Sequence, residues 1–310
     1  MFLILGDLAL DVIPEPVPAR DAIERLALGD DATMRSGLSF VPGGSAMLFA
    51  ESIEAHHPGE SLIVAALGPD PAARILQAAM TAAGMATTGL EHIGEGTTKV
   101  VLLASFPDCG RLMLYPGSHT GDLLSTAFAT RLLTTVDPAS VRCLWLSGYC
   151  LTDRDAPRYE ATRRICAWCH SNGVPVVLDL VPHDFADRVG DLAEVERRLG
   201  PLTGVIGEYT TFTELGFTPG WTDGTRGALA SVAAAVSAER GFAVVQHREN
   251  ASVYLQSAAR AGVHLRTATY PIPVAGTRGL GDHMSVDALG WMGLATARRR
   301  ATAGDPACRP

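Results

Sequence analysis

A glycine-rich stretch near the C-terminus decides the fold prediction. Residues 276–284 read Gly-Thr-Arg-Gly-Leu-Gly-Asp-His-Met, and an apolar helical pattern follows. Glycines let the backbone approach a ligand closely and turn sharply into a helix. The free N–H groups at a helix start attract a phosphate group or a developing anion, and Asp282 at that point can accept a proton from a substrate hydroxyl. The alternative is that Asp282 only caps a helix after a glycine-rich turn.

Upstream of this stretch, short apolar runs typical of strands alternate with amphipathic patterns typical of helices. We predict strands at residues 2–5, 62–66, 143–146, 175–178, 204–206 and 242–246. We predict helices at residues 45–56, 71–83, 124–134, 155–171, 192–199, 226–239 and 282–297. This alternation predicts an α/β fold with a mainly parallel central sheet and helices on both faces.

Two segments interrupt the alternation. Residues 12–41 are proline-rich and predicted to be irregular, and Pro-Asp-Cys-Gly separates two apolar runs at residues 99–106 and 111–115, which predicts a hairpin. Because ligands bind at strand ends in open α/β folds, we expect both segments to leave the same sheet edge and form a small β-rich lid. The chain is therefore predicted to be a single domain over residues 1–310, with lid segments near residues 12–41 and 97–117.

The composition excludes several classes of function. The chain has 310 residues, of which 47% are hydrophobic and 19% charged, and its formal net charge is −8. Its single lysine, Lys99, is followed by valine, so the chain has no Walker A loop, and any Schiff-base chemistry would have to use that residue. The acidic balance argues against a nucleic-acid or anionic-membrane partner.

Targeting and redox signals are absent from the sequence. The apolar residues 1–5 are followed by Asp7 and Asp11, which does not resemble a signal peptide, and no run approaches the roughly 18 apolar residues of a membrane span. Six cysteines in a chain of this size do not indicate a disulfide framework. Cys166 and Cys169 form a CxxC inside a helical pattern, which favours helix packing over a redox or metal pair. We therefore expect a reduced, cytoplasmic protein.

Six short motifs occur in an order and spacing that together are informative. They are Gly-Asp-Leu-Ala-Leu-Asp at residues 6–11, Pro-Gly-Gly-Ser at 42–45, Gly-Pro-Asp at 68–70, Gly-Arg at 110–111, Val-Leu-Asp at 177–179 and Gly-Leu-Gly-Asp at 279–282. With these motifs the chain resembles the ribokinase-like sugar kinases, the PfkB carbohydrate kinase family, over nearly its whole length. The resemblance implies a three-layer ribokinase-like fold with a small β lid. It also implies ATP-dependent phosphorylation of a hydroxyl group on a sugar, a nucleoside or a related small polyol.

The resemblance further implies roles for residues around the reacting centre. Asp282 resembles the family's catalytic base, which takes the proton of the substrate hydroxyl as it attacks the γ-phosphate of ATP. The backbone amides of Gly279, Leu280 and Gly281 would form an anion hole for the transferring phosphoryl group. Asp11 resembles the aspartate that binds sugar hydroxyls.

Other residues resemble the family's substrate, nucleotide and metal groups. Gly43 and Gly44 match the glycine pair on the substrate side. Asp179 resembles the aspartate that helps to organise Mg²⁺ and its waters, and Glu208 would join it through water. On the nucleotide side, the resemblance points to Glu208, His247 and Arg278, the last of which either contacts a phosphate bidentately or covers the sheet edge.

The chain departs from the family pattern mainly on the nucleotide and magnesium side. The Asn-x-x-Glu magnesium motif aligns with residues 208–211, where Thr211 stands in place of the glutamate. The nucleotide-side Gly-x-x-Gly falls on His-Arg-Glu-Asn at residues 247–250, and Asp-Thr-x-Gly has become Gly-Thr-Arg-Gly at residues 276–279. On the substrate side, Leu48 replaces the usual asparagine.

Two functions therefore follow from the resemblance. The first is a carbohydrate or nucleoside kinase that uses ATP and Mg²⁺. The alternative is a divergent family member that binds a sugar-like ligand but has lost or altered its use of ATP. In both cases the expected partner is a small molecule, with neither nucleic acid nor membrane, and lid strands that pair between subunits would give a homodimer.

Overall fold

The computed structural model describes residues 1–15, 37–106, 110–181, 184–219, 224–247, 252–257, 260–266, 285–286 and 288–290. The glycine-rich stretch at residues 276–284 therefore lies outside the described residues. Of the helix predicted at residues 282–297, the structure describes residues 285–286 and 288–290, and these are helical. No helix within the described ranges is long and apolar enough to cross a membrane.

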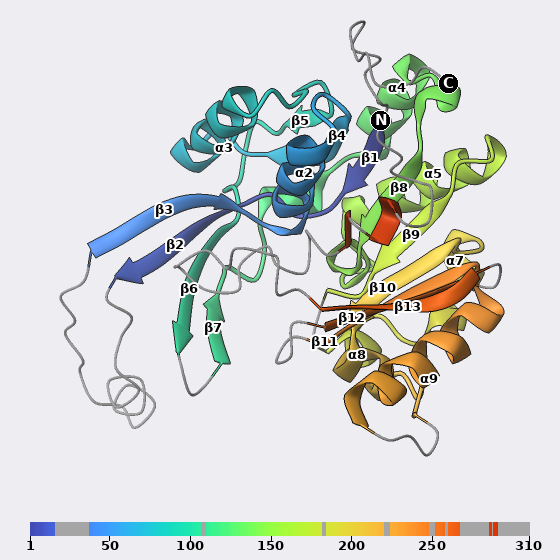
Figure 1. The fold of residues 1–310 in the computed structure, drawn as a ribbon. Coiled ribbons are helices and arrows are strands. Elements are labelled where there is room, and N and C mark those ends of the chain that lie inside the picture. The colour runs from blue at the N-terminus through green and yellow to red at the C-terminus, as the bar shows by residue number, and fades with distance from the viewer. Residues whose placement is uncertain are drawn as a thin grey trace, which may run out of the picture.

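The main sheet has nine strands in the order β13-β12-β11-β10-β9-β8-β1-β4-β5 (Figure 1). Neighbouring strands from β11 to β5 in this order run parallel, whereas β12 and β13 are added antiparallel. The strands are β1 (Phe2–Leu5), β4 (Ser61–Leu67), β5 (Leu90–His92), β8 (Cys143–Ser147), β9 (Val176–Asp179), β10 (Gly204–Glu208), β11 (Phe242–His247), β12 (Ser252–Ser257) and β13 (Arg260–Arg266).

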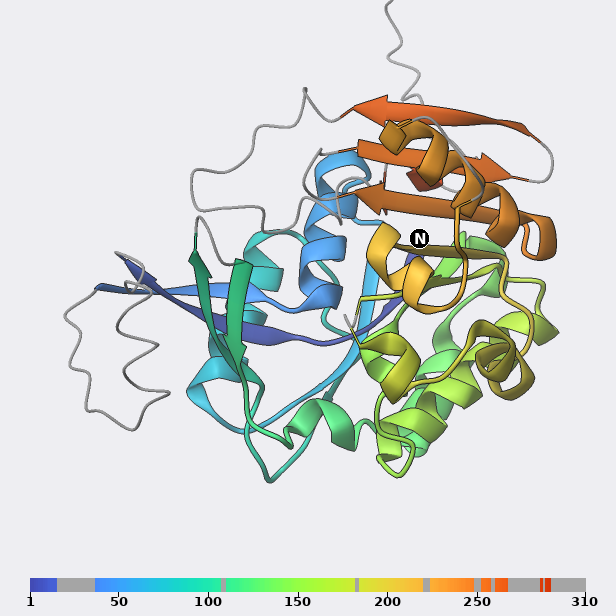
Figure 2. The same ribbon diagram turned by 90° about the horizontal axis from the view of Figure 1, so that it is seen from below.

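Helices cover both faces of this sheet, so the predicted three-layer α/β architecture is confirmed (Figures 1 and 2). Successive residues of β1 alternate between two apolar cores: Phe2 and Ile4 pack with α2 and α3, and Leu3 and Leu5 pack on the other face with α4, α5, α7 and α9. The helices are α2 (Ser45–His56), α3 (Pro71–Ala82), α4 (Thr126–Thr135), α5 (Pro157–Ser171), α6 (Phe185–Arg188), α7 (Leu192–Leu199), α8 (Tyr209–Glu214) and α9 (Gly224–Glu239), with short 3₁₀ turns η1 (Thr120–Leu123), η2 (Pro138–Ser140) and η3 (Gly148–Leu151).

Local signals explain why these elements form where the sequence predicts them. Pro71 occupies the first turn of α3, where its missing N–H has no intrahelical partner to lose, and the Asp70 carboxylate accepts a hydrogen bond from the N–H of Ala73 at 2.9 Å. In the same way Pro157 begins α5, two residues later than predicted. Val286, Ala288 and Leu289 contribute apolar side chains to the same core as α2.

A second sheet of four strands, in the order β3-β2-β6-β7, projects from one side of the main body (Figures 1 and 2). It contains β2 (Ala9–Glu15), β3 (Gly37–Gly43), β6 (Val100–Phe106) and β7 (Gly110–Leu114). The antiparallel pairing of β6 with β7 confirms the predicted hairpin.

The prediction that residues 12–41 are irregular was wrong at both ends of that segment, because residues 9–15 and 37–43 form the antiparallel pair β2–β3. The prolines do not prevent this pairing. Pro42 lies on β3, which is an edge strand and can lack a ladder donor on its outer side. Pro14 lies beyond the part of β2 that pairs with β6, which ends at Val12. Residues 16–36 lie outside the described residues.

Candidate functional site

The candidate site lies at the carboxyl ends of β1 and β8, where α2 begins. The hydroxyl of Ser45, the first residue of α2, donates a hydrogen bond to Ser147 Oγ at 2.9 Å and accepts one from the N–H of Asp7 at 3.3 Å. The N–H of Ala46 donates to the Asp7 carbonyl at 3.0 Å. Gly6 leaves room for this junction, since a Cβ there would come within 2.9 Å of Ser45 Oγ.

The predicted substrate-side residues Asp11, Gly43 and Gly44 come together beside this junction. Asp11 is buried, with 6% of its surface exposed, and a Cβ on Gly43 would overlap its carboxylate. Gly44 has φ +87°, a left-handed conformation that favours glycine, and a Cβ there would overlap the Asp7 carbonyl. The glycine pair therefore allows β3 and the start of α2 to approach the chain segment that connects β1 and β2.

A buried network of charges lies directly behind this region. Lys99 Nζ is 2.5 Å from Asp7 Oδ2, and Arg158 pairs with the other oxygen of the same carboxylate. Arg158 Nη2 also lies 2.8 Å from Asp122 Oδ1 and donates to the carbonyl of Tyr149 at 2.8 Å. The side chains of Asp7, Lys99 and Arg158 are each less than 10% exposed.

The protonation states in this network follow from burial and from the two cations. Burial by itself raises the pKa of Asp7, but the charges of Arg158 and Lys99 outweigh it and hold that pKa well below its usual range. Burial lowers the pKa of His119, although the charges of Asp7 and Asp122 oppose this shift. Burial, assisted by the Asp7 charge, raises the pKa of Tyr149 to about 12.

The ammonium of Lys99 also lies against two aromatic rings. Its Nζ is 4.6 Å from the ring centroid of Tyr115 and 5.1 Å from that of Tyr149, distances at which a cation is attracted to an aromatic face. Tyr115 follows β7 and Tyr149 lies in η3, so the contacts connect the second sheet to the main body. Tyr115 also hydrogen bonds with Arg188 of α6, an interaction that raises the pKa of Arg188 although burial opposes it.

The residues predicted for metal and nucleotide binding end neighbouring strands at the same edge. Asp179 ends β9 and is the register partner of Ser147, while Glu208 ends β10 and pairs with Gln246. Within the described residues, no group of three or more His, Cys, Asp or Glu side chains is arranged to hold a metal ion. Magnesium is normally held by one or two carboxylates together with water and substrate phosphates, so these two carboxylates fit it.

The predicted catalytic residues Gly279, Leu280, Gly281 and Asp282 and the predicted nucleotide residue Arg278 lie outside the described residues. The described structure resumes at Ser285, whose hydroxyl accepts a hydrogen bond from Gln246 Nε2 at 3.1 Å. The backbone of His247, also predicted for the nucleotide site, ends β11.

Sequence analysis missed the network of Asp7, Lys99 and Arg158. One signal could have found it: in α5, Arg158 lies on the helix face that also buries Thr162, Ile165 and Cys169. A charged residue on a buried helix face needs a buried partner. The prediction that the two cysteines of the CxxC pack within a helix agrees with the structure, since Cys166 and Cys169 are buried in α5 as free thiols.

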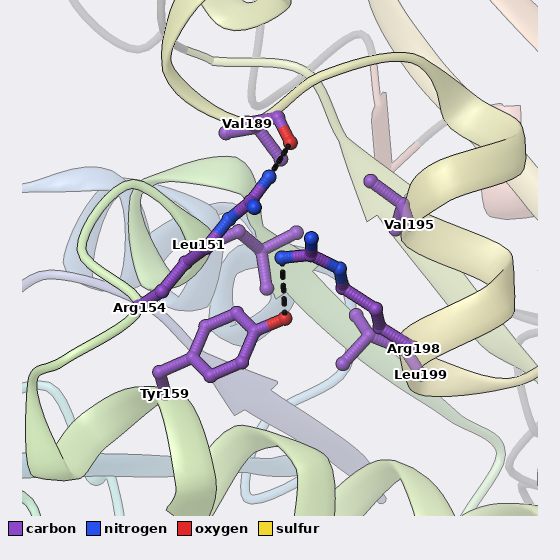
Figure 3. A pocket seen from close by; sticks show the side chains of 7 residues that line it. All are labelled: Leu151, Arg154, Tyr159, Val189, Val195, Arg198 and Leu199. Carbon is purple, nitrogen blue, oxygen red and sulfur yellow. Dashed lines mark hydrogen bonds between the residues drawn. The ribbon is translucent and has the colours of Figure 1, made fainter.

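A separate small pocket lies between η3, the start of α5 and α7 (Figure 3). Its lining contains none of the predicted site residues. Arg154 donates to the Val189 carbonyl at 2.8 Å, and Arg198 Nη1 lies 3.5 Å from the hydroxyl of Tyr159 (Figure 3). Both guanidinium groups thus bond within the protein and hold these elements together.

Comparison with known proteins identifies the fold. No family model matches the sequence, and the search of curated proteins finds no match. The structure is similar to a candidate ribokinase II from E. coli in complex with ATP and Mg²⁺ (TM-score 0.71, 15% identity, covering 94% of this chain and 86% of the other). It is also similar to adenosine kinase from Sinorhizobium meliloti, with a TM-score of 0.69 and 18% identity, over 94% of this chain and 87% of the other. Fructokinase from Xylella fastidiosa with bound ATP gives a TM-score of 0.67 and 14% identity, over 94% of this chain and 81% of the other. The chain has the ribokinase-like fold, as its motifs predicted.

Proposed function

We propose that this protein is a kinase that transfers the γ-phosphoryl group of ATP to a hydroxyl group of a sugar, a nucleoside or a related small polyol. One observation carries the proposal: Asp11, Gly43 and Gly44 meet beside the carboxyl ends of β1 and β8 in a ribokinase-like fold. Adenosine kinase and ATP-bound fructokinase have the same fold. In this proposal the Asp11 carboxylate accepts hydrogen bonds from acceptor hydroxyls, and the second sheet covers the acceptor and excludes water.

In the proposed reaction, Asp282 takes the proton of the acceptor hydroxyl while its oxygen attacks the γ-phosphorus and ADP leaves. Asp282 precedes Ser285 by three residues, and Ser285 contacts the carboxyl end of β11 through Gln246. This supports assigning Asp282 to the same edge as Asp11. The backbone amides of Gly279 to Gly281 would stabilise the charge on the transferring group.

On the donor side, we propose that Asp179 and Glu208 hold Mg²⁺ through water, and that Glu208, His247 and Arg278 lie against the nucleotide. When bound, Mg²⁺ neutralises charge on the phosphate oxygens. The positions of Asp179 and Glu208 at the ends of the adjacent strands β9 and β10 support this assignment.

The second candidate function is a sugar-binding protein with lost or altered use of ATP. The observation that favours it is Thr211, which occupies the place of the family's glutamate and is 2% exposed in α8. A buried threonine supplies no carboxylate to a metal site.

The test is a screen of sugars and nucleosides with ATP–Mg²⁺, followed by Asp282→Asn on the best acceptor. Loss of the general base should lower kcat by about 10²–10⁴-fold, with an unchanged melting temperature. Asp155→Asn, at an exposed aspartate before α5, is the matched control and should keep the wild-type rate. An unaffected rate in Asp282→Asn rules out its role as the base. Calorimetry with ATP–Mg²⁺ separates the two functions, because tight ordinary binding argues against the second.

We also propose that the outer face of the second sheet pairs with a second copy of the chain. Phe40, Val12, Leu102 and Leu114 are register partners across β3, β2, β6 and β7 and form one apolar row. Phe40 is 57% exposed and Leu114 is 54% exposed. An apolar row of this kind on a projecting sheet is typical of an interaction surface.

A further inference from the structure

Four chain segments connect the second sheet to the main body, and all four meet around Asp7. Asp7 lies in the first segment, between β1 and β2. The second is Gly44, between β3 and α2, where a Cβ would overlap the Asp7 carbonyl. The third, between β5 and β6, ends with Lys99, whose Nζ is 2.5 Å from Asp7 Oδ2. The fourth, between β7 and η1, begins with Tyr115, whose ring centroid is 4.6 Å from the same Nζ. A rotation of the second sheet relative to the main sheet would therefore disturb these contacts.

On the main-body side, buried groups hold this cluster in place. Arg158 of α5 pairs with the Asp7 carboxylate and donates to the carbonyl of Tyr149 in η3. The ring centroid of Tyr149 lies 5.1 Å from Lys99 Nζ. The backbone of Lys99 pairs with the second sheet instead, because its carbonyl accepts a hydrogen bond from the N–H of Leu10 at 2.9 Å. The side chain of Lys99 thus reaches from the second sheet into the main body.

Tyr115 is the most exposed member of this cluster. It is 40% exposed, whereas the side chains of Asp7 and Lys99 are 3% and 9% exposed. Its hydroxyl hydrogen bonds with Arg188 of α6, a side chain that is 39% exposed and also lies 3.3 Å from Asp184. Tyr115 therefore contacts the ammonium with its ring and a helix of the main body with its hydroxyl.

Contacts of this strength matter more for the orientation of the second sheet than for folding. A cation over a partly exposed aromatic face and an exposed hydrogen bond each contribute little beside a buried ion pair. The same energy changes the ratio between two orientations of a sheet several-fold, because that ratio depends exponentially on the energy difference. Tyr115 is thus placed to set the orientation of the second sheet without being required for the fold.

We infer that Tyr115 is a positioning residue that holds the second sheet in place over the candidate site. Its ring keeps the ammonium of Lys99 against Asp7, and its hydroxyl joins the end of β7 to α6. The kinetic consequence rests on the proposed function, in which the second sheet covers the acceptor, whereas the effect on the connecting segments does not. Without the Tyr115 side chain, these segments should open more often and the acceptor should bind more weakly.

The first experiment measures the opening of the connecting segments by amide hydrogen exchange. The N–H groups of Leu10 and Thr120 report on it, because they donate to the carbonyls of Lys99 and Thr97 at 2.9 and 3.0 Å. Tyr115→Leu should raise the exchange rates of both by about 3- to 10-fold, the loss of one cation–π contact, and leave the amides of β1 at their wild-type rates. Unchanged rates at Leu10 and Thr120, or an equal increase in β1, overturn the inference.

Two further variants separate the ring from its hydroxyl and from any aromatic contact with a cation. Tyr115→Phe keeps the ring against Lys99, so its exchange rates should lie between those of the wild type and Tyr115→Leu. Phe128→Leu is the matched control, because it removes a ring whose centroid lies 5.9 Å from the guanidinium of Arg131 within the main body. It should leave the reporting amides at their wild-type rates. A Phe128→Leu variant that raises them as much as Tyr115→Leu also overturns the inference.

The second experiment measures the effect on binding of the acceptor. With the best acceptor from the screen, Tyr115→Leu should raise KM for the acceptor by about 3- to 10-fold and leave KM for ATP unchanged. Tyr115→Phe should recover most of the loss. An unchanged acceptor KM in Tyr115→Leu overturns the positioning role even if exchange is faster, and an equal rise in both KM values does the same.

The two experiments also separate this inference from the proposed function. Faster exchange at Leu10 and Thr120, but no phosphoryl transfer to any compound, supports the role of Tyr115 and refutes the kinase. Transfer with wild-type exchange rates and an unchanged acceptor KM in Tyr115→Leu refutes the role of Tyr115 and leaves the kinase standing.

Discussion

Replacing Asp7 by asparagine should destabilise the protein strongly, because it leaves buried cations without their shared carboxylate. The Asp7 side chain is 3% exposed and contacts Lys99 and Arg158, which are 9% and 6% exposed. After the substitution, Arg158 keeps Asp122 at 2.8 Å and the Tyr149 carbonyl, whereas Lys99 keeps no carboxylate among the described residues. Removing one partner of a buried ion pair costs about 3–5 kcal/mol, against a total stability of about 5–15 kcal/mol for a typical protein.

Urea unfolding followed by circular dichroism measures this loss. The midpoint should fall with an unchanged slope, since the same surface is exposed on unfolding. The control is Asp184→Asn, which breaks the exposed pair of Asp184 with Arg188 and should cost less than about 1 kcal/mol. The double variant Asp7→Asn with Lys99→Met removes the unpaired ammonium and should be more stable than Asp7→Asn alone. A loss below about 1 kcal/mol in Asp7→Asn, or a double variant as unstable as the two changes added together, refutes the buried network.

The ion pairs of Asp7 with Lys99 and Arg158 also predict how the stability of the protein changes with pH. The folded-state pKa of Asp7 lies below its unfolded value of about 3.9. The ionised carboxylate therefore stabilises the native state fully above that value, and the stabilisation is lost as the pH falls toward the folded-state pKa. The stability difference between the wild type and Asp7→Asn should be constant from pH 7 to about pH 5 and should shrink below about pH 4. A difference that grows as the pH falls contradicts this assignment.

Three further predictions follow from backbone geometry, burial and the apolar row. Gly44→Ala should cost about 2 kcal/mol or more in urea unfolding, because it combines a left-handed φ with an overlap, whereas Gly59→Ala, with φ +75° and open space around its Cβ, should cost about 1 kcal/mol. Cys166 and Cys169 should resist alkylation at pH 8 in the native protein and react in urea. The reason is that burial raises the pKa of Cys166 far above its usual value and that of Cys169 to about 12. Equal alkylation rates in the native and the unfolded protein would contradict this prediction. Phe40→Asp should convert a dimer to a monomer in sedimentation, and a monomeric wild type refutes the proposed pairing.

The main sheet could be predicted from the sequence because its signals are local. Each strand is a short apolar run, and a helix such as α3 carries its own start signal in Asp70 and Pro71. The pair β12–β13 was missed because these strands join the sheet antiparallel, contrary to the strand–helix alternation of the rest. The strands β2 and β3 were also missed, because their segments contain prolines and form strands only by pairing with each other.

The candidate site could be predicted only where a motif is continuous in sequence. Gly43 and Gly44 directly precede the helix α2, so this motif could be recognised from the sequence. The ion network was not predictable in this way, because Lys99 lies 92 residues from Asp7 and Arg158 lies 151 residues from it. Such contacts depend on how β1, β6 and α5 are brought together, which no local pattern records.

The glycine pair and the lone lysine differ in how far structure alone accounts for them. Gly44 is required by the backbone itself, because its φ is left-handed and a Cβ there would overlap the Asp7 carbonyl, whereas Gly43 is required by the side chain of Asp11, whose carboxylate a Cβ would overlap. Packing does not require Lys99 in the same way: burying its ammonium costs desolvation and side-chain entropy, and Arg158 already pairs with Asp7. Lys99 is instead explained within the described residues by its ion pair with Asp7 and by its contacts with the rings of Tyr115 and Tyr149.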